Sequence, residues 1–375
     1  MLIGVDGNEA NVSNRVGTGQ YTYYLLKHWQ KQASSELSFR IYLSSPPKDW
    51  LPKKNPYFEY VHFGPKKLWT QIALPIKLFW EKETPDVFFS PAHYAPRIAK
   101  TKTVVAIHDL AYLTHPKEFR AIDQKQLSSW TKYSVRKAKK VIAVSHNTKN
   151  DLIDFYQLPE EKITVIHNGF DHRRFHPNLT KSNIKNIKEK YQIDGDYLVY
   201  LGTLQPRKNI ESLIRAFPEI IRKNPNTKLV VIGKKGWLYS TVFSLVQKLN
   251  LEKKVIFTDF VPDEEVPFLI AGAQIFVLPS LYEGFGITAL EAMACGVPVV
   301  VSRVSSLPEV VGDAGLYVDN PKNYAQIAKQ INKILADSSL AKKLTKKGIN
   351  QSKKFSWEKC AEKTLEEIKN TALLV

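Results

Sequence analysis

PSLYEGFGITALEAMACGVPVV, residues 279–300, is the stretch that decides the fold of this chain. The apolar run at 273–278 directly before it is typical of a buried parallel strand. Good helix formers with apolar residues at helical spacing follow at 287–295, and a Gly and a Pro then end the predicted helix. A further apolar run at 297–301 reads as the next buried strand. This succession of strand, glycine loop, helix and strand predicts an α/β fold built on a parallel sheet.

The loop in this unit predicts an anion site framed by two acids. Gly284 and Gly286 allow backbone N–H groups to approach an anion closely, at a helix start that favours negative charge. Carboxylates suit sugar hydroxyls, which are donors that need acceptors. We therefore expect a diphosphate flanked by two sugars, with the ribose on Glu291 and the transferred sugar on Glu283. Taken singly, either acid could be a solvated residue near the helix start. The expected donor contacts here are Glu283, Gly284, Phe285, Gly286, Ile287 and Glu291.

The two acids stand in a pattern with a known counterpart. Glu283, seven intervening residues, Glu291 and then MACGVPVV at 293–300 resemble the E-x7-E signature of the retaining glycosyltransferases of family 4, the glycosyl transferases group 1. The resemblance covers nearly the whole chain. It implies an α/β fold of the GT-B type, with two Rossmann-like domains whose parallel sheets face each other across a cleft. It also implies metal-independent, retaining transfer of a sugar from a nucleotide-diphosphate sugar to a glycan or lipid-linked acceptor, with no cofactor.

A second basic loop completes the expected donor site. Arg207 and Lys208 precede a predicted helix at 210–222, where two cations suit a diphosphate. The resemblance assigns catalytic roles to Lys208 and Glu283 and places the backbone at Val261 near the nucleobase. The stretches at 206–209 and 233–237 resemble mannosyltransferases of surface-polysaccharide assembly, so GDP-mannose is our first expectation for the donor.

In the first half, a strand at 2–6 and a helix at 20–32 enclose Gly17 and Gly19, which permit close approach of a substrate. The Gly-x-Gly-x-x-Thr pattern lacks the third glycine of a dinucleotide site. His108 ends a buried strand at 103–107, an edge where parallel sheets bind ligands. The resemblance places all three residues on the donor and gives His108 a catalytic role. A metal site is the alternative for the local side chains His93, His108, Asp109 and His115.

The length of 375 residues predicts two domains. A polar stretch rich in Lys and Asn at 176–195 reads as the linker, so we expect domains at 1–180 and 196–354. The resemblance returns the last helix, within 355–375, to the first domain. The chain is expected to be helical over 323–347, with basic residues on its outer surface.

The composition of the chain indicates its cellular compartment and the kind of partner it binds. The chain has two cysteines, far apart in sequence, which excludes a disulfide framework and favours the cytoplasm. No signal peptide or membrane span is apparent. The net charge of +18 suggests an anionic partner, and the absence of a nucleic-acid-binding motif favours a membrane face over nucleic acid. The segment 64–83 mixes lysines with large apolar residues, and it could lie peripherally on the inner face of a membrane or pack as an ordinary surface helix.

Other functions of the same fold stay open at this point. A sugar-nucleotide epimerase or a phosphorylase could use a similar diphosphate site. A membrane-bound or glycan-binding scaffold with an inactive site is the non-enzymatic alternative. The presence of Lys208, Glu283 and Glu291 together favours an active transferase.

Overall fold

The computed structural model describes residues 1–98, 100–234 and 240–374. The chain forms two compact units, one from Met1–Gly169 with Trp357–Val375 and the other from Phe170–Ser356. The polar stretch 176–195, where we expected the linker, therefore lies inside the second unit. It contains helix α6 (Lys181–Lys190), which packs on helix α9 (Val266–Ala271). The linker prediction was wrong because α6 is mostly polar, and only isolated isoleucines supply its apolar face.

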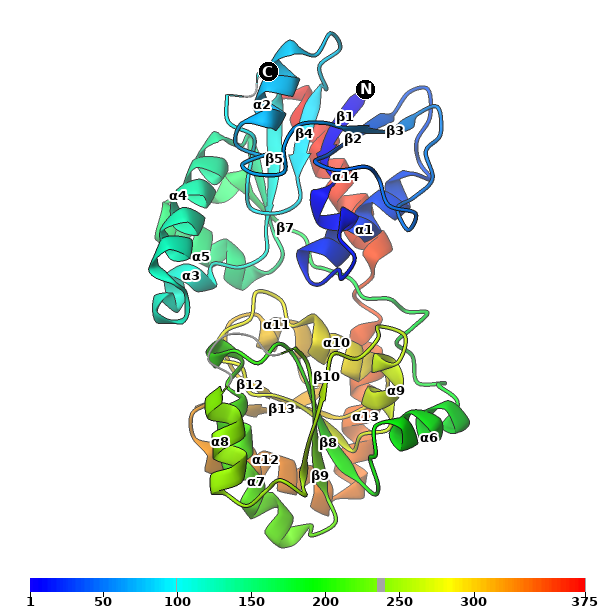
Figure 1. Cartoon of the computed structure of the whole chain (residues 1–375), viewed down its shortest axis with the longest axis vertical. Helices are drawn as coiled ribbons and strands as arrows, with labels where there is room; N and C mark the ends of the chain where they lie inside the picture. The colour runs from blue at the N-terminus through cyan, green and yellow to red at the C-terminus, as the bar shows by residue number, and fades with distance from the viewer. Residues whose placement is uncertain (99, 235–239, 375) are drawn as a thin grey trace. The chain divides into compact units, whose positions relative to one another are not determined.

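The first unit is built on a seven-stranded parallel sheet in the order β3-β2-β1-β4-β5-β6-β7 (Figure 1). Its central strands, such as β4 and β5, are mostly buried apolar runs, as expected where helices cover both faces. The strands are β1 (Leu2–Asp6), β2 (Ser38–Leu43), β3 (Phe58–His62), β4 (Val87–Ser90), β5 (Lys102–Ile107), β6 (Lys140–Ala143) and β7 (Ile163–Val165). The helices are α1 (Thr18–Trp29), α2 (Ala73–Trp80), α3 (Ala111–Thr114), α4 (Ala121–Lys137), α5 (His146–Tyr156) and α14 (Trp357–Leu373), with 3-10 turns at Asn8–Asn11, Pro116–Glu118 and Glu160–Lys162.

Helix α14 belongs to this first unit although it comes last in the chain. It lies against α1, β4 and β5 (Figure 1). The indole N–H of Trp29, which is fully buried, donates to the Ala361 carbonyl at 2.9 Å. The rings of Tyr24 and Trp357 stack with centroids 5.2 Å apart. The core of the first unit is therefore closed by residues that lie more than 300 positions downstream of α1.

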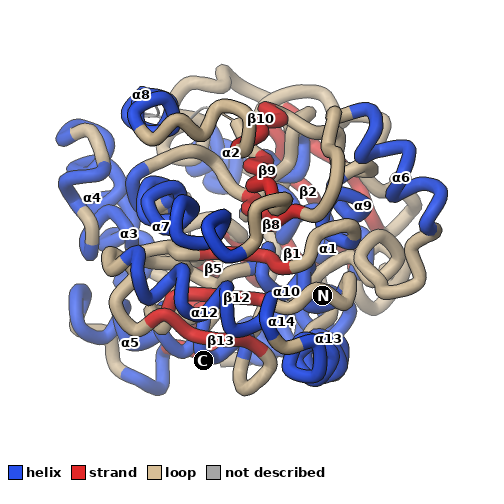
Figure 2. The backbone as a smooth tube through the Cα atoms, turned by 90° about the horizontal axis from the view of Figure 1, so that it is seen from below, coloured by secondary structure: helices blue, strands red, loops and turns tan. Residues whose placement is uncertain are grey.

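The second unit holds a six-stranded parallel sheet in the order β10-β9-β8-β11-β12-β13. The strands are β8 (Tyr197–Leu201), β9 (Lys228–Ile232), β10 (Val255–Asp259), β11 (Ile275–Leu278), β12 (Val299–Ser302) and β13 (Gly315–Val318). Besides α6 and α9, the helices are α7 (Ile210–Lys223), α8 (Ser240–Lys248), α10 (Ile287–Ala294), α11 (Leu307–Val311), α12 (Tyr324–Ala336) and α13 (Ser338–Ser352), with a 3-10 turn at Pro206–Lys208. Helix α7 packs with α8 and α12, α10 packs with α9 and α13, and α12 also lies beside β13 (Figure 2).

The helical chain expected at 323–347 consists of two helices, α12 and α13. Asp337 lies between them with an extended backbone, and its carboxylate accepts from the backbone N–H of Leu340 at 2.9 Å. This N-cap begins a new helix, which the apolar spacing alone did not reveal. None of the described helices is both long and apolar enough to cross a membrane.

Candidate active site

The second unit gathers its charged loops at one point of the sheet. Its strand order reverses between β8 and β11, and in open parallel sheets ligands bind at such a reversal, beyond the carboxyl ends of the strands. Arg207 and Lys208 follow β8 in a single 3-10 turn, and Glu283 follows β11. The topology therefore brings together two loops that are 75 residues apart in sequence.

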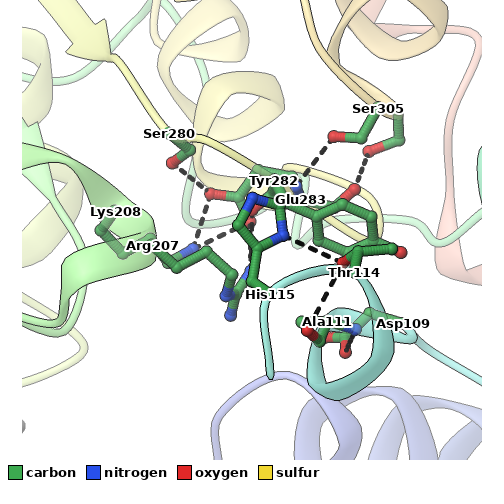
Figure 3. A network of polar contacts seen from close by, with 11 residues as sticks. Asp109, Ala111, Thr114, His115, Arg207, Lys208, Ser280, Tyr282, Glu283 and Ser305 are labelled. Atoms are coloured by element: carbon green, nitrogen blue, oxygen red, sulfur yellow. Dashed lines mark hydrogen bonds and ion pairs between the residues drawn. The ribbon is translucent and has the colours of Figure 1, made fainter. Parts of the chain in front are cut away.

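Glu283 is the centre of this arrangement (Figure 3). Its side chain is buried, with 7% of the residue's surface exposed. The Lys208 ammonium lies 2.6 Å from Oε1 and 2.8 Å from Oε2, and the Ser280 hydroxyl donates to Oε1 at 2.6 Å. Arg207 Nη1 lies 3.9 Å from Oε2. Burial by itself raises the pKa of Glu283, but the two cations and these hydrogen bonds hold it below its usual value.

Two serines after β12 fix the backbone of Glu283. The hydroxyl of Ser305 accepts from the Glu283 N–H at 2.8 Å, and the buried hydroxyl of Ser306 donates to the Glu283 carbonyl at 2.8 Å (Figure 3 shows Ser305). Ser305 holds a left-handed backbone, with φ of 45°. Hydrogen bonds to both the N–H and the carbonyl of Glu283 therefore fix the backbone that carries the carboxylate, as a preorganised charge requires.

Arg207 and its neighbours tie the two loops together. The guanidinium of Arg207 donates to the Tyr282 carbonyl at 2.8 Å, and the Arg207 carbonyl accepts from the Leu281 N–H at 2.8 Å. The Asn209 amide donates to the carbonyls of Pro279 and Pro321 at 2.9 and 2.7 Å. These contacts hold the basic turn against the glycine loop.

Gly286 sets the start of α10. Its backbone is left-handed, with φ of 91°, and a Cβ there would lie 2.6 Å from the Leu307 side chain. A glycine is needed on both counts. The preceding loop runs through Gly284 and the buried Phe285, and Ile287 is the first residue of the helix. The N–H groups of a helix start lack intrahelical partners and can receive an anion.

Glu291 lies within α10 and differs from Glu283 in its surroundings. It is half-buried, and no hydrogen bond to its carboxyl is found among the described residues. Burial raises the pKa of Glu291 to about 8; Arg174 lowers it, while Asp263 and Asp171 raise it. The carboxyl therefore carries a proton at neutral pH, so it can donate as well as accept. The sequence interpretation had treated it as an acceptor alone.

The predicted nucleobase position follows β10. Val261 is buried, whereas Phe260 beside it is 49% exposed, with Lys234 Nζ 4.6 Å from the centre of its ring. An exposed aromatic ring next to a cation offers a flat surface on which a base could stack. Of the stretch 233–237 that suggested a mannosyltransferase, residues 235–237 lie outside the described residues.

In the first unit, His108 directly follows β5, and its hydrogen bonding fixes which ring nitrogen carries the proton. Its Nε2 lies 2.7 Å from the Pro91 carbonyl, which can only accept, so Nε2 carries a proton. Burial, followed by the influence of His93, lowers the pKa of His108 to about 4. The ring is therefore neutral at pH 7, and Nδ1 is an acceptor. Its ring also lies against those of Tyr21, edge to face at 4.8 Å, and of His93, tilted at 5.9 Å between centroids.

Gly17 and Gly19 of the first unit differ in what surrounds them. Gly17 has φ of 38° and opens α1, with space around it, whereas a Cβ on Gly19 would lie 2.8 Å from the Glu9 carbonyl. Gly17 is thus open to a ligand, and packing against the Glu9 carbonyl requires a glycine at Gly19. The alternative metal site is not formed: among the described residues, no three of the side chains His93, His108, Asp109 and His115 bring ligand atoms within 4.8 Å of one another.

Comparison with known proteins supplies the family. The family model described as Glycosyl transferases group 1 matches residues 183–351, and the one described as Glycosyltransferase Family 4 matches residues 16–174. The O-antigen chain mannosyltransferase B of Escherichia coli is 35% identical over 291 residues, which cover 76% of this chain and 74% of that protein. The chain belongs to glycosyltransferase family 4.

This family 4 glycosyltransferase has further relatives. The O-antigen chain mannosyltransferase RfbU of Salmonella typhimurium is 30% identical over 64% of each chain. The crystal structure of Anabaena Alr3699/HepE with UDP and glucose matches 98% of this chain and 99% of its own, with a TM-score of 0.77 at 20% identity. The expected GT-B fold is confirmed, and the protein is an enzyme that transfers a sugar from a nucleotide sugar.

Sequence reasoning brought Lys208 and Glu283 of this glycosyltransferase to one ligand but did not foresee that they pair with each other. It also missed Ser280, Ser305 and Ser306 as the residues that position Glu283. A signal was present, because the stretch SSLPE at 305–309 follows a strand end at the same edge of the sheet.

Proposed function

We propose that this glycosyltransferase transfers its sugar with retention of anomeric configuration, and that the Lys208–Glu283 pair forms the centre of its donor site. The observation that carries the proposal is this buried pair, with contacts of 2.6 and 2.8 Å, at the strand reversal of the second sheet. A lysine held there presents a fixed charge to a diphosphate, while the carboxylate presents an acceptor to a sugar hydroxyl.

The reaction moves charge toward the leaving group. The bond between the sugar's anomeric carbon and the phosphate oxygen breaks, and its electron pair leaves with the nucleoside diphosphate. The acceptor hydroxyl oxygen bonds to the same face of that carbon, and its proton passes to an oxygen of the leaving phosphate. Lys208, Arg207 and the backbone N–H groups of 284–287 stabilise the charge that develops on the diphosphate. No metal ion is required in this scheme.

Three side chains orient the two sugars. Glu283 accepts a hydrogen bond from a hydroxyl of the transferred sugar. Glu291 holds the ribose, and its proton lets it serve both hydroxyls. Neutral His108 accepts through Nδ1 from the donor sugar or acceptor. Gly17 admits the donor closely because nothing lies within 4 Å of its missing side chain.

We propose mannose, carried as GDP-mannose, as the transferred sugar, and a glycan or lipid-linked glycan as the acceptor. Two relatives named as O-antigen mannosyltransferases support this choice, while the Anabaena structure holds UDP and glucose. UDP-glucose is therefore the competitor that a donor test must include.

The proposal is tested by donor binding and turnover. Isothermal titration with GDP-mannose and UDP-glucose, in the presence of EDTA, identifies the donor, and NMR of the product gives the anomeric configuration. Lys208→Ala should lower turnover at least tenfold, whereas Lys223→Ala, an exposed lysine at the far end of α7, should leave it unchanged. Near-normal turnover of the Lys208 variant, or an inverted product, would reject the assignment.

A further inference from the structure

Helix α2 of the first unit is apolar on two faces. One face is buried: Leu74 and Leu78 pack with Tyr42, Trp69 and Phe88. The other face is exposed and consists of Ile72 at 52%, Ile76 at 56%, Phe79 at 44% and Trp80 at 77% exposure. Packing on the domain therefore explains only half of the apolar residues in α2. A helix that is apolar all round is expected in a buried or membrane environment, so the outer face needs a partner.

The exposed face continues onto neighbouring segments. Leu68, before the helix, is 44% exposed, and Ile98, which follows β4 in the chain, is 76% exposed. Two contacts hold the Ile98 segment to α2: Arg97 donates to the Gln71 side chain at 2.7 Å, and Lys100 Nζ lies 4.2 Å from the centre of the Phe79 ring. We call these exposed side chains the apolar patch, and its members are Leu68, Ile72, Ile76, Phe79, Trp80 and Ile98.

The charges around the apolar patch are positive. Lys66, Lys67, Lys82 and Lys100 are exposed. No acidic partner for Lys66, Lys67 or Lys82 is found within the part of the chain that the structure describes.

The acids of the same segment are already used inside the unit. Arg40 lies 3.5 Å from Glu81 and 3.0 Å from Glu83, and Glu81 also takes the Tyr42 hydroxyl and Lys77. The lysines are therefore left to face an external anion.

We propose that the apolar patch docks this enzyme on the surface of an anionic lipid bilayer. Aromatic and aliphatic side chains would enter the boundary between headgroups and acyl chains, while the lysines stay at the level of the lipid phosphates. A second copy of the chain fits poorly, because each copy carries a net charge of +18 and the patch is rimmed by the same sign. The inference does not depend on the choice of donor or on the roles of Lys208 and Glu283.

Vesicle flotation tests the proposal with the full chain. We expect the protein to float with vesicles of phosphatidylglycerol and phosphatidylcholine, to bind pure phosphatidylcholine at least tenfold more weakly, and to dissociate as salt is raised. Phe79→Ser with Trp80→Ser should lower binding at least tenfold. Ile122→Ser is the matched control, because Ile122 is 74% exposed in the same unit but lies on α4. Lys66→Glu with Lys67→Glu should weaken binding to the anionic vesicles only.

Three results would overturn the inference. These are failure of the wild type to float with anionic vesicles, equal binding by the Phe79/Trp80 variant, and an equal loss in the Ile122 control. Light scattering over a range of concentrations provides a fourth readout: self-association that the Phe79/Trp80 variant abolishes would assign the patch to a second copy instead. Circular dichroism and soluble turnover verify that each variant is folded, since none of these residues belongs to the donor site.

Discussion

Replacing Lys208 by Met should destabilise the second unit more than a typical surface change would. In the structure the Lys208 ammonium contacts both oxygens of the buried Glu283 carboxylate. Removing one partner of a buried ion pair leaves an uncompensated charge and costs about 3–5 kcal/mol. The Ser280 hydroxyl and Arg207 remain near Glu283, so we expect the lower value, about 3 kcal/mol. For a unit of this size that corresponds to a fall in Tm of roughly 6–12 °C.

The loss should depend on pH with a defined sign. The pKa of Glu283 in the folded wild type is lowered, on balance, against the effect of its burial. Such a group contributes stability above its unfolded pKa and loses it as the pH falls through the folded pKa. In Lys208→Met the burial acts without the lysine, so the pKa of Glu283 should rise. The stability gap between wild type and variant should be widest near pH 7–8 and should narrow as Glu283 becomes protonated in acid.

A double-mutant cycle makes this measurable. Thermal and urea unfolding of wild type, Lys208→Met, Glu283→Gln and the double variant, at pH 5 and pH 8, give the coupling free energy. We expect about 2 kcal/mol of coupling at pH 8 and less at pH 5. Lys223→Met serves as the control. A coupling below about 0.5 kcal/mol, or a gap independent of pH, would show that the pair contributes little and would refute the reasoning.

Other predictions follow from neighbouring residues. The stability of Glu291→Gln relative to the wild type should increase by up to about 4 kcal/mol as the pH rises from 5 to 9. The reason is that the folded pKa of about 8 exceeds the pKa in the unfolded chain, so ionisation of Glu291 opposes folding of the wild type; parallel melting curves at the two pH values check this. Ser306→Ala should cost about 1–2 kcal/mol and raise KM for the donor, since the Glu283 carbonyl loses its buried donor; turnover and urea unfolding measure both. Gly286→Ala should weaken donor binding at least tenfold in calorimetry, because the left-handed backbone and the Leu307 contact both oppose a Cβ. Unchanged values in any of these assays would contradict the corresponding contact.

Much of the fold was predictable because buried parallel strands are continuous apolar runs. The range expected for β1 (Leu2–Asp6) agrees with the structure end to end. The two elements that the sequence did not reveal, β3 and α6, are only partly buried. β3 (Phe58–His62) lies at the edge of its sheet with one fully buried residue, and α6 packs through a few isoleucines on an otherwise polar surface. Their signals are weak because little apolar area is removed from water there.

The sequence suggested members of the candidate site but not their network of contacts. The glycine loop and the two acids are local in sequence, so the roles that we propose for them could be formulated from spacing. The pairing of Lys208 with Glu283 depends on which strands are neighbours in the sheet, and strand order is not written in any short stretch. The pKa of Glu291 likewise depends on its burial in the folded chain and on the charges of residues distant in sequence, which include Arg174 and Asp263.

The position of α14 has a consequence for how the molecule is made. The second unit is one uninterrupted segment, whereas the first needs residues from both sides of it. During synthesis, the opening half of the chain must wait for α14 to leave the ribosome before Trp29 finds its carbonyl partner. A product that ends directly after the second unit, at residue 356, would therefore carry a complete second unit beside an unsealed first one, and proteases could distinguish it from the full-length enzyme.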